Sequence, residues 1–307
     1  FLSIGAISSS SSSSNNNNSI PMRLRIHHRT EYTYPQPVSE SANEVRLKPR
    51  QNRWQDCDSC LISVLPAAPL TPYLDLYQNQ AHRFQVTEPH IRLVVDSRAR
   101  VTTKPRIDFE QLPYGMTISD LKQLQELESC YPFLQPSHYI SLDREIWRQA
   151  VDIQGQSTDV FQTAYAIMEH IFDVYDYREG TTVVSTPAHE VIQQKTGVCQ
   201  DFAHAMVALC RSLRMPTRYV SGYFFDATHD HRLRGSQASH AWAEVYLKDV
   251  GWVGFDPTNR KVVDETYITL AIGRDYQDVA PVAGTFYGGS ETLLNVDVRV
   301  RRLERAI

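Results

Sequence analysis

Residues 196–213 of this 307-residue chain read TGVCQDFAHAMVALCRSL, a segment with the apolar spacing of one buried helix face. We expect this helix to open at residues 196–198 and to stop before Pro216, which cannot continue a helix. Cys199 falls in the first turn, where the positive end of the helix dipole and free backbone N–H groups stabilise a thiolate. The same N–H groups can hold a developing oxyanion, so Cys199 is a candidate nucleophile and its backbone N–H a candidate oxyanion donor.

A nucleophilic cysteine needs a base to take its proton and a third group to orient that base. Residues 239–247 (SHAWAEVYL) and 251–258 (GWVGFDPT) have the composition of two strands, the first opening with His240 and the second ending with Asp256. Side chains alternate between strand faces, so a hairpin loop of three or five residues places Asp256 on the face of His240. With a loop of five residues, Asp256 lies opposite Trp242 and diagonal to His240. A loop of two or four residues without a bulge would separate them.

Four blocks of the sequence together resemble the transglutaminase-like cysteine protease superfamily, and they occur in the family's order. The blocks are residues 197–204 (GVCQDFAH), 218–223 (RYVSGY), 238–245 (ASHAWAEV) and 251–258 (GWVGFDPT). The N-terminal half resembles the β-rich region of the bacterial members through Tyr32, Tyr34, Pro37, Val38, Arg46, Leu47, Pro49 and Arg50. Residues 273–279 resemble the segment after the core in the same group, so the likeness covers nearly all of residues 22–307.

The resemblance implies an α+β protein, with a papain-like (transglutaminase core) cysteine-hydrolase domain preceded by a β-sandwich domain. It implies Cys199 as nucleophile, His240 as general base and acid, and Asp256 as the residue that orients the imidazole. The family's reaction begins with thiolate attack on an amide carbonyl, which gives a thioester and releases an amine. We expect hydrolysis of an amide or peptide bond, because water is always present whereas amine transfer needs a dry, amine-selective site. Amine transfer to glutamine side chains and a non-catalytic peptide-binding scaffold are the alternatives.

Further residues are candidates for contact with the substrate. Trp242, Tyr223 and Asp275 are the candidate substrate-binding residues, although a strand tryptophan can equally be a packed core residue. Residues 274–276 could close over the active site or brace the core against the N-terminal domain. A loop cluster has atom types that suit a metal: Asp226, His229, Asp230 and His231. We favour a solvated loop there and expect no metal and no cofactor.

Charge and cysteine content exclude several functional classes. The chain has 31 Lys and Arg against 35 Asp and Glu, a formal charge of −4, so no global field favours nucleic acid or an acidic membrane. No apolar run approaches the roughly 20 residues of a spanning helix. We expect a peptide or protein substrate. The sequence allows a homo-oligomer but does not decide the oligomeric state. Five cysteines are few and odd in number, which favours a reducing compartment and a cytoplasmic location. Cys57 and Cys60 form a C-x-x-C that we interpret as ordinary strand positions.

The composition along the chain predicts its division into domains. Residues 1–21 contain serine and asparagine runs and are expected to be a disordered extension, a linker or an expression remnant. The expected units are a β-sandwich at 22–110, a helical connector at 111–155, the catalytic core at 156–290 and a C-terminal strand at 291–307. We expect that last strand to be able to return to the first domain.

Overall fold

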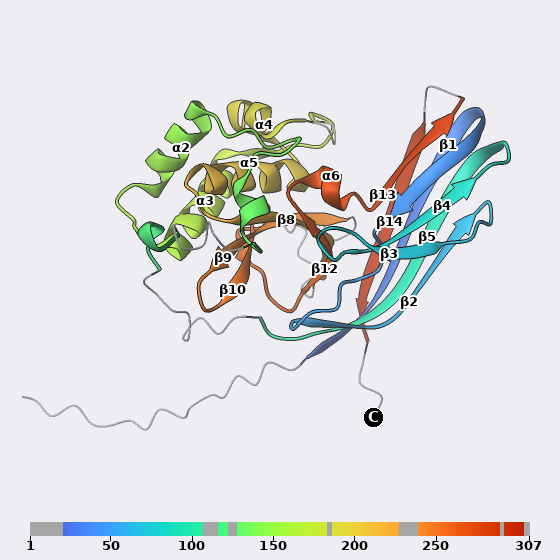
Figure 1. Ribbon diagram of the computed structural model, residues 1–307, viewed down its shortest axis with the longest axis horizontal. Coiled ribbons are helices and arrows are strands. Elements are labelled where there is room, and N and C mark those ends of the chain that lie inside the picture. The colour runs from blue at the N-terminus through green and yellow to red at the C-terminus, as the bar shows by residue number, and fades with distance from the viewer. Residues whose placement is uncertain are drawn as a thin grey trace, which may run out of the picture.

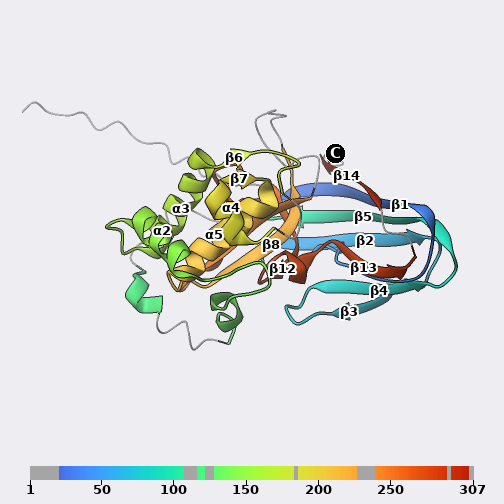
Figure 2. The same ribbon diagram turned by 90° about the horizontal axis from the view of Figure 1, so that it is seen from above.

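The chain forms two lobes, one of long strands and one of helices packed on a sheet (Figure 1). The computed structural model describes residues 21–106, 116–121, 128–182, 186–226, 239–288 and 292–303. Figure 2 shows the helices gathered in one lobe and the long strands of the other extending away from it. This is the mixed α and β architecture, with a β-rich N-terminal region, that the sequence predicts.

One long strand organises the N-terminal lobe. The first part of β1 (Met22–Val45) pairs antiparallel with β5 (His90–Thr103) on one side and β14 (Leu293–Arg302) on the other, and β2 (Gln55–Leu65) adds beside β5. Residues 22–30 of β1 alternate strictly between buried and more exposed, because one face covers the core of the lobe. The C-terminal strand therefore lies in the N-terminal lobe.

The second part of β1 belongs to another set of strands. It pairs with β4 (Gln80–Val86) and with β13 (Val282–Tyr287), and β3 (Thr71–Leu74) adds beside β4. Residues from both sets enclose one apolar core. Residues 282–287, placed in the catalytic core from the sequence, thus pair with the N-terminal lobe, because the chain crosses back before its last strand.

The second lobe is built on a five-stranded antiparallel sheet. Its strands in spatial order are β11 (Lys261–Val262), β10 (Gly251–Asp256), β9 (His240–Leu247), β8 (Thr217–Phe224) and β12 (Tyr267–Gly273). The helices of this lobe are α2 (Arg144–Gln154), α3 (Val160–Val174), α4 (Ala188–Gln194), α5 (Cys199–Ser212) and α6 (Tyr276–Val279). Among the described residues, the shorter elements are the 3₁₀ turns Ile118–Asp120 and Tyr131–Leu134 and a strand pair, β6 (Asp176–Tyr177) with β7 (Thr196–Gly197). None of the described helices is long and apolar enough to cross a membrane.

Helix α5 is the centre of this lobe. It packs against β9, α2, α3 and α4, and its residues 201–211 are all buried. The helix begins at Cys199, slightly later than the sequence suggests, because Gly197 pairs as a strand residue and Val198 is extended. A Cβ at Gly197 would lie 2.6 Å from the Cβ of Asp201, so this close turn requires glycine.

The two lobes are joined along the edge of β12. The side-chain amide of Gln55 accepts from the N–H of Thr269 and donates to its carbonyl, both at 2.8 Å. Asn79 does the same at Ile272, at 2.9 and 2.7 Å. Two amides of the N-terminal lobe thus take the hydrogen-bonding place of a further strand, which satisfies backbone groups that an edge strand leaves open.

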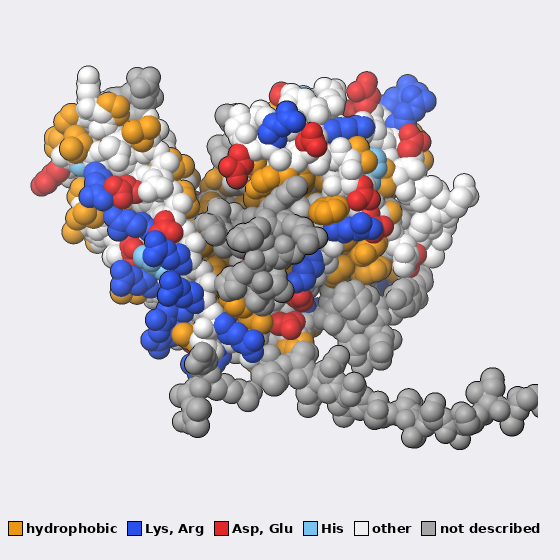
Figure 3. All heavy atoms as spheres, turned by 180° about the vertical axis from the view of Figure 1, so that it is seen from behind, with side chains coloured by type: hydrophobic (Ala, Val, Ile, Leu, Met, Phe, Trp, Pro, Cys, Tyr) orange, Lys and Arg blue, Asp and Glu red, His pale blue; other side chains and the backbone are white. Residues whose placement is uncertain are grey.

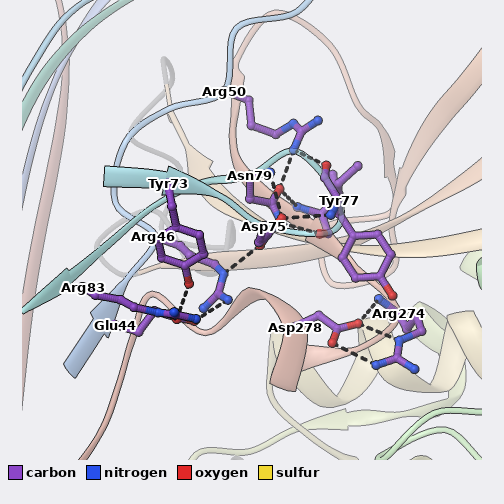
Figure 4. Close-up of polar contacts among 11 residues, drawn as sticks. Glu44, Arg46, Arg50, Tyr73, Asp75, Tyr77, Asn79, Arg83, Arg274 and Asp278 are labelled. Carbon is purple, nitrogen blue, oxygen red and sulfur yellow. Dashed lines mark hydrogen bonds and ion pairs between the residues drawn. The ribbon is translucent and has the colours of Figure 1, made fainter. Parts of the chain in front are cut away.

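Polar contacts fix the loop that carries Asn79 (Figure 4). Asp75 accepts from the Asn79 side chain at 2.9 Å and from Arg46 at 3.1 Å, and Arg50 donates to the carbonyl of Tyr77 at 3.0 Å. The Tyr77 side chain points towards an ion pair of the other lobe. The N-terminal lobe therefore contacts the second lobe through a loop held by hydrogen bonds.

Candidate active site

The N-terminus of α5 presents Cys199 within a tightly held turn. Asp201 accepts a hydrogen bond from the N–H of Val198 at 2.8 Å and from the hydroxyl of Thr182 at 2.6 Å. Asp201 therefore caps the helix start, the role expected for an acid near the positive end of the dipole. Cys199 is 7% exposed, at the margin of the core rather than at its centre.

The hairpin of β9 and β10 brings His240 and Asp256 together. Gly251 pairs with Leu247, which leaves a three-residue loop and sets Asp256 in register with Trp242, diagonal to His240. Nε2 of His240 lies 2.7 Å from Oδ2 of Asp256, and both side chains are fully buried. The prediction that an odd loop length places the two on one face is confirmed.

Burial and charge act in opposite directions on this pair. Burial would lower the pKa of His240, but the charge and hydrogen bond of Asp256, together with the Cys199 side chain, raise it to about 10. Burial would raise the pKa of Asp256, but the interaction with His240 and further hydrogen bonds hold it below its usual range. The interaction with Asp256 therefore favours the charged form of the imidazole.

Asp256 has more partners than the sequence suggested. Its Oδ2 also accepts from the hydroxyl of Tyr267 at 2.8 Å and from Nδ2 of Asn259 at 2.9 Å, and Oδ1 accepts from the N–H of Thr258 at 2.9 Å. Asn259 could have been found from its place in the turn after the strand, where side-chain bonds to an aspartate are common. Tyr267 carries no such local signal, because it reaches Asp256 from β12.

His240 interacts less closely with Cys199 than with Asp256. Nδ1 of His240 has no conventional hydrogen-bond partner among the described residues, while the ring still interacts with the Cys199 side chain. With Nε2 committed to Asp256, Nδ1 is the nitrogen free to take and return a proton. Catalytic hydrogen bonds are often long without substrate and tighten when it binds.

The three candidate substrate-binding residues are buried among other residues of the protein. Trp242 is fully buried, with its ring 5.3 Å from that of Tyr267. Tyr223 is 1% exposed at the lobe interface, where its hydroxyl lies 2.8 Å from Nδ1 of His28. Asp275 is 1% exposed and accepts from the N–H of Tyr139 at 3.0 Å. All three side chains are buried: Trp242 in an aromatic cluster of the sheet, Tyr223 at the lobe interface and Asp275 at the start of α6.

The segment after the core braces the fold rather than covering the site. Arg274 is paired with Asp278 at 2.9 Å, and the carbonyl of Arg274 accepts from the buried Arg211 at 2.7 Å. Nearby, His204 is buried, and Nε2 of its ring accepts from the N–H of Tyr276 at 3.1 Å. Burial lowers the pKa of His204 to about 4, which keeps it neutral in a structural role.

The remaining metal and cysteine candidates do not add to the site. His229, Asp230 and His231 lie outside the described residues, which contain no group of three or more metal-ligating side chains. Cys57 and Cys60 are half-buried free cysteines on β2, and burial raises the pKa of both. Neither has the environment of a reactive thiol.

Comparison with known proteins agrees with the fold. Residues 148–257 match the model of the transglutaminase-like superfamily, and residues 24–102 match the bacterial transglutaminase-like N-terminal region. An uncharacterized protein of Mycobacterium leprae is 33% identical over 284 residues, covering 92% of this chain and 99% of its own. A Cytophaga hutchinsonii structure described as a "Putative Cysteine Protease" has a TM-score of 0.77 at 25% identity, covering 94% of this chain and 93% of its own. A protein-glutamine gamma-glutamyltransferase of Pseudomonas aeruginosa is 28% identical over 102 residues, 31% of this chain and 15% of its own.

A helix-start cysteine beside a buried histidine–aspartate pair, on a mixed α and β fold, resembles the arrangement of papain-like cysteine proteases. The chain belongs to the transglutaminase-like superfamily, with the bacterial N-terminal region of that family.

Proposed function

We propose that the protein is a thiol-dependent hydrolase that cleaves an amide or peptide bond of a peptide or protein substrate. The observation that carries this proposal is the fully buried His240–Asp256 pair, 2.7 Å apart, in interaction range of Cys199 at the start of α5. Burial alone favours a neutral imidazole, so a buried histidine that a carboxylate holds in the charged form is suited to activating a thiol.

The reaction begins with the Cys199 thiolate and the His240 imidazolium. Sγ attacks the amide carbon, and the backbone N–H of Cys199 stabilises the oxyanion that forms. The imidazolium gives its proton to the leaving nitrogen, the C–N bond breaks, and a thioester remains. His240 then removes a proton from water, which attacks the thioester; the C–S bond breaks, the acid leaves, and the imidazolium–thiolate pair is restored. Asp256 holds the ring in orientation throughout.

Amine transfer is the second candidate function, and the partial likeness to the Pseudomonas aeruginosa transferase favours keeping it. The first half of the reaction is the same, and an amine replaces water in attacking the thioester. The two functions separate in one assay, in which the enzyme is given a glutamine-containing protein with and without a fluorescent primary amine. Hydrolysis releases ammonia or new termini without added amine, whereas transfer attaches the label.

The first test is the rate of iodoacetamide labelling at each cysteine between pH 5 and 9, read by peptide mass spectrometry. We expect Cys199 to react fastest at pH 6.5, and to lose this advantage in His240→Ala. Cys57, half-buried on β2, is the internal control and should be unaffected by that substitution. Equal labelling of Cys199 and Cys57 across the whole range would show that no thiolate–imidazolium pair exists, and the hydrolase proposal would fail.

A further inference from the structure

An arginine-rich surface lies on the outward face of the N-terminal lobe, remote from the three candidate catalytic residues in sequence. We define the arginine face by the exposed side chains of Arg23, Arg25, Arg98, Arg100, Arg299 and Arg301, on β1, β5 and β14. Figure 3 shows Lys and Arg gathered in a band on this lobe. The local charge is the reverse of the formal charge of −4 of the whole chain.

The strand register sets like charges side by side on this face. Arg25 pairs with Arg100 of β5 on one side and with Arg301 of β14 on the other. Directly opposed side chains of one charge destabilise a sheet, since their Cβ atoms lie only about 5 Å apart. A row of three guanidiniums across three strands therefore weakens the free protein, and a bound polyanion would relieve the repulsion.

Acidic neighbours compensate only part of the face. Arg98 is 3.0 Å from Asp96, and Arg299 is 2.8 Å from Asp297. The other four members, Arg23, Arg25, Arg100 and Arg301, form no ion pair with any residue that the structure describes. These four exposed guanidiniums keep their hydrogen-bond donors available for another chain. Each guanidinium can bind a carboxylate of that chain through bidentate hydrogen bonds.

The geometry favours an extended acidic peptide over other polyanions. Arg23 and Arg25 are two residues apart on one strand face, a spacing of about 6.6 Å that also separates alternate side chains of an extended peptide. The face carries no Phe, Tyr or Trp among its described outward residues, and so lacks the stacking surface of single-stranded nucleic acid sites. With the four unpaired arginines set aside, the rest of the chain has a formal charge of −8 (−4 minus 4), which opposes broad anionic surfaces such as a membrane or a duplex.

The strands that carry the arginine face reach the second lobe at one end, through a side chain on their opposite, buried face. Thr103, which pairs with Met22 beside Arg23, donates to the carbonyl of Glu265 at 2.6 Å. Two residues further along, the hydroxyl of Tyr267 donates to Asp256. The strands of the arginine face therefore end beside the lobe that holds Cys199.

We propose that the arginine face is a docking site for acidic segments of the polypeptide substrate. The inference rests on the proposed hydrolase function for the identity of the ligand as substrate, but not for the binding itself. It assigns to the N-terminal lobe a role in substrate selection: proteins with acidic stretches near the cleaved bond are held more tightly than neutral ones.

Binding of a fluorescein-labelled oligoglutamate to the full-length protein, followed by fluorescence anisotropy, tests the docking site. Arg25→Gln combined with Arg100→Gln is the test variant, and Arg144→Gln combined with Arg148→Gln, on the exposed side of α2, is the control with the same change in charge. We expect the test variant to bind about tenfold more weakly and the control to bind within twofold of wild type. Wild-type binding should weaken between 20 and 200 mM salt.

Two outcomes would overturn the inference. The first is oligoglutamate binding that is equal in the test and control variants, or absent from wild type. The second is binding of anionic vesicles or of duplex DNA that is lost in the test variant while oligoglutamate does not bind, which would assign the face to another partner. The unbound test variant should also unfold at a higher temperature than wild type, because the repulsion is relieved, and this shows that a loss of binding is not a loss of folding.

The binding assay is independent of turnover. If Cys199 fails the alkylation test while oligoglutamate binding still depends on Arg25 and Arg100, the hydrolase proposal fails and the docking site stands. If turnover is present, a substrate with an acidic tail should show a raised KM and an unchanged kcat in the test variant, whereas its neutral counterpart should show neither change.

Discussion

Replacing Asp256 by Asn removes the negative charge of the buried pair and keeps the size of the side chain. The substitution is best made together with Cys199→Ala, so that the thiol does not titrate in the comparison. Without the carboxylate, burial dominates and His240 gives up its proton near neutral pH. Loss of one partner of a fully buried ion pair costs about 3–5 kcal/mol, so Asp256→Asn should destabilise the Cys199→Ala protein by that amount at pH 6.

The expected difference depends on pH with a definite sign. Unfolded His240 titrates near 6.5, whereas the folded pKa is raised to about 10, mainly by Asp256 once burial has been overcome. Below pH 6.5 both states hold the proton, and the stabilisation is fully present. Between pH 6.5 and 10 only the folded state holds it, so the free energy of unfolding falls by as much as about 1.4 kcal/mol per pH unit. With Asp256→Asn this slope should disappear.

Urea unfolding followed by circular dichroism at pH 6, 7, 8 and 9 measures the effect. The gap between Cys199→Ala and the double variant should be widest at pH 6 and should close as the pH rises. Asp152→Asn, at an exposed position of α2, is the matched control and should leave the slope unchanged. A gap that stays constant from pH 6 to 9 would refute a charged His240 and with it the electrostatic account of the site.

Three further substitutions test how the site is supported. Tyr267→Phe removes one donor to the buried Asp256 carboxylate and should lower the free energy of unfolding by about 1.5–3 kcal/mol in urea, whereas no change would mean that water replaces the hydroxyl. Gln55→Leu leaves the N–H of Thr269 without a partner, while its carbonyl keeps the N–H of Arg50 at 3.1 Å, and the change should cost about 1–3 kcal/mol in the same assay; a neutral result would show that the amide does not support that edge. Gly222→Ala places a Cβ 2.6 Å from the ring of Trp242 and should cost about 1–3 kcal/mol or more, seen as a lower Tm, unless β8 can shift freely.

The part of the site that follows from one hairpin could be predicted from the sequence. His240 and Asp256 lie 16 residues apart on consecutive strands, so strand parity and loop length suffice to place them on one face. The helix that begins at Cys199 is likewise evident from its apolar spacing, although its start is displaced by the strand pairing of Gly197. Local periodicity determines such features.

The parts that depend on non-consecutive neighbours could not be predicted. Tyr267 reaches Asp256 because β12 adds beside β8, across the sheet from β10, and no spacing in the sequence reveals that order. From the sequence, Tyr223 and Asp275 are candidates for substrate contact, Asp275 because residues 274–276 could close over the active site. The structure buries both, since β8 also contributes to the core of the N-terminal lobe and Asp275 accepts from a distant backbone. Sequence shows which residues are polar or aromatic, but not which lobe will cover them.

The side-chain amides of Gln55 and Asn79 make the edge of β12 in the second lobe dependent on residues of the N-terminal lobe. If a related N-terminal lobe were grafted onto this catalytic lobe, backbone similarity alone would be insufficient, because the donor would have to bring two amides at the spacing of Thr269 and Ile272. A graft without these amides would leave backbone groups of the edge strand β12 unpaired. Such an edge can pair with any extended chain, including a second copy of the protein. An exchange of lobes between relatives should therefore preserve this contact only when the amides and the β12 strand edge come from the same protein.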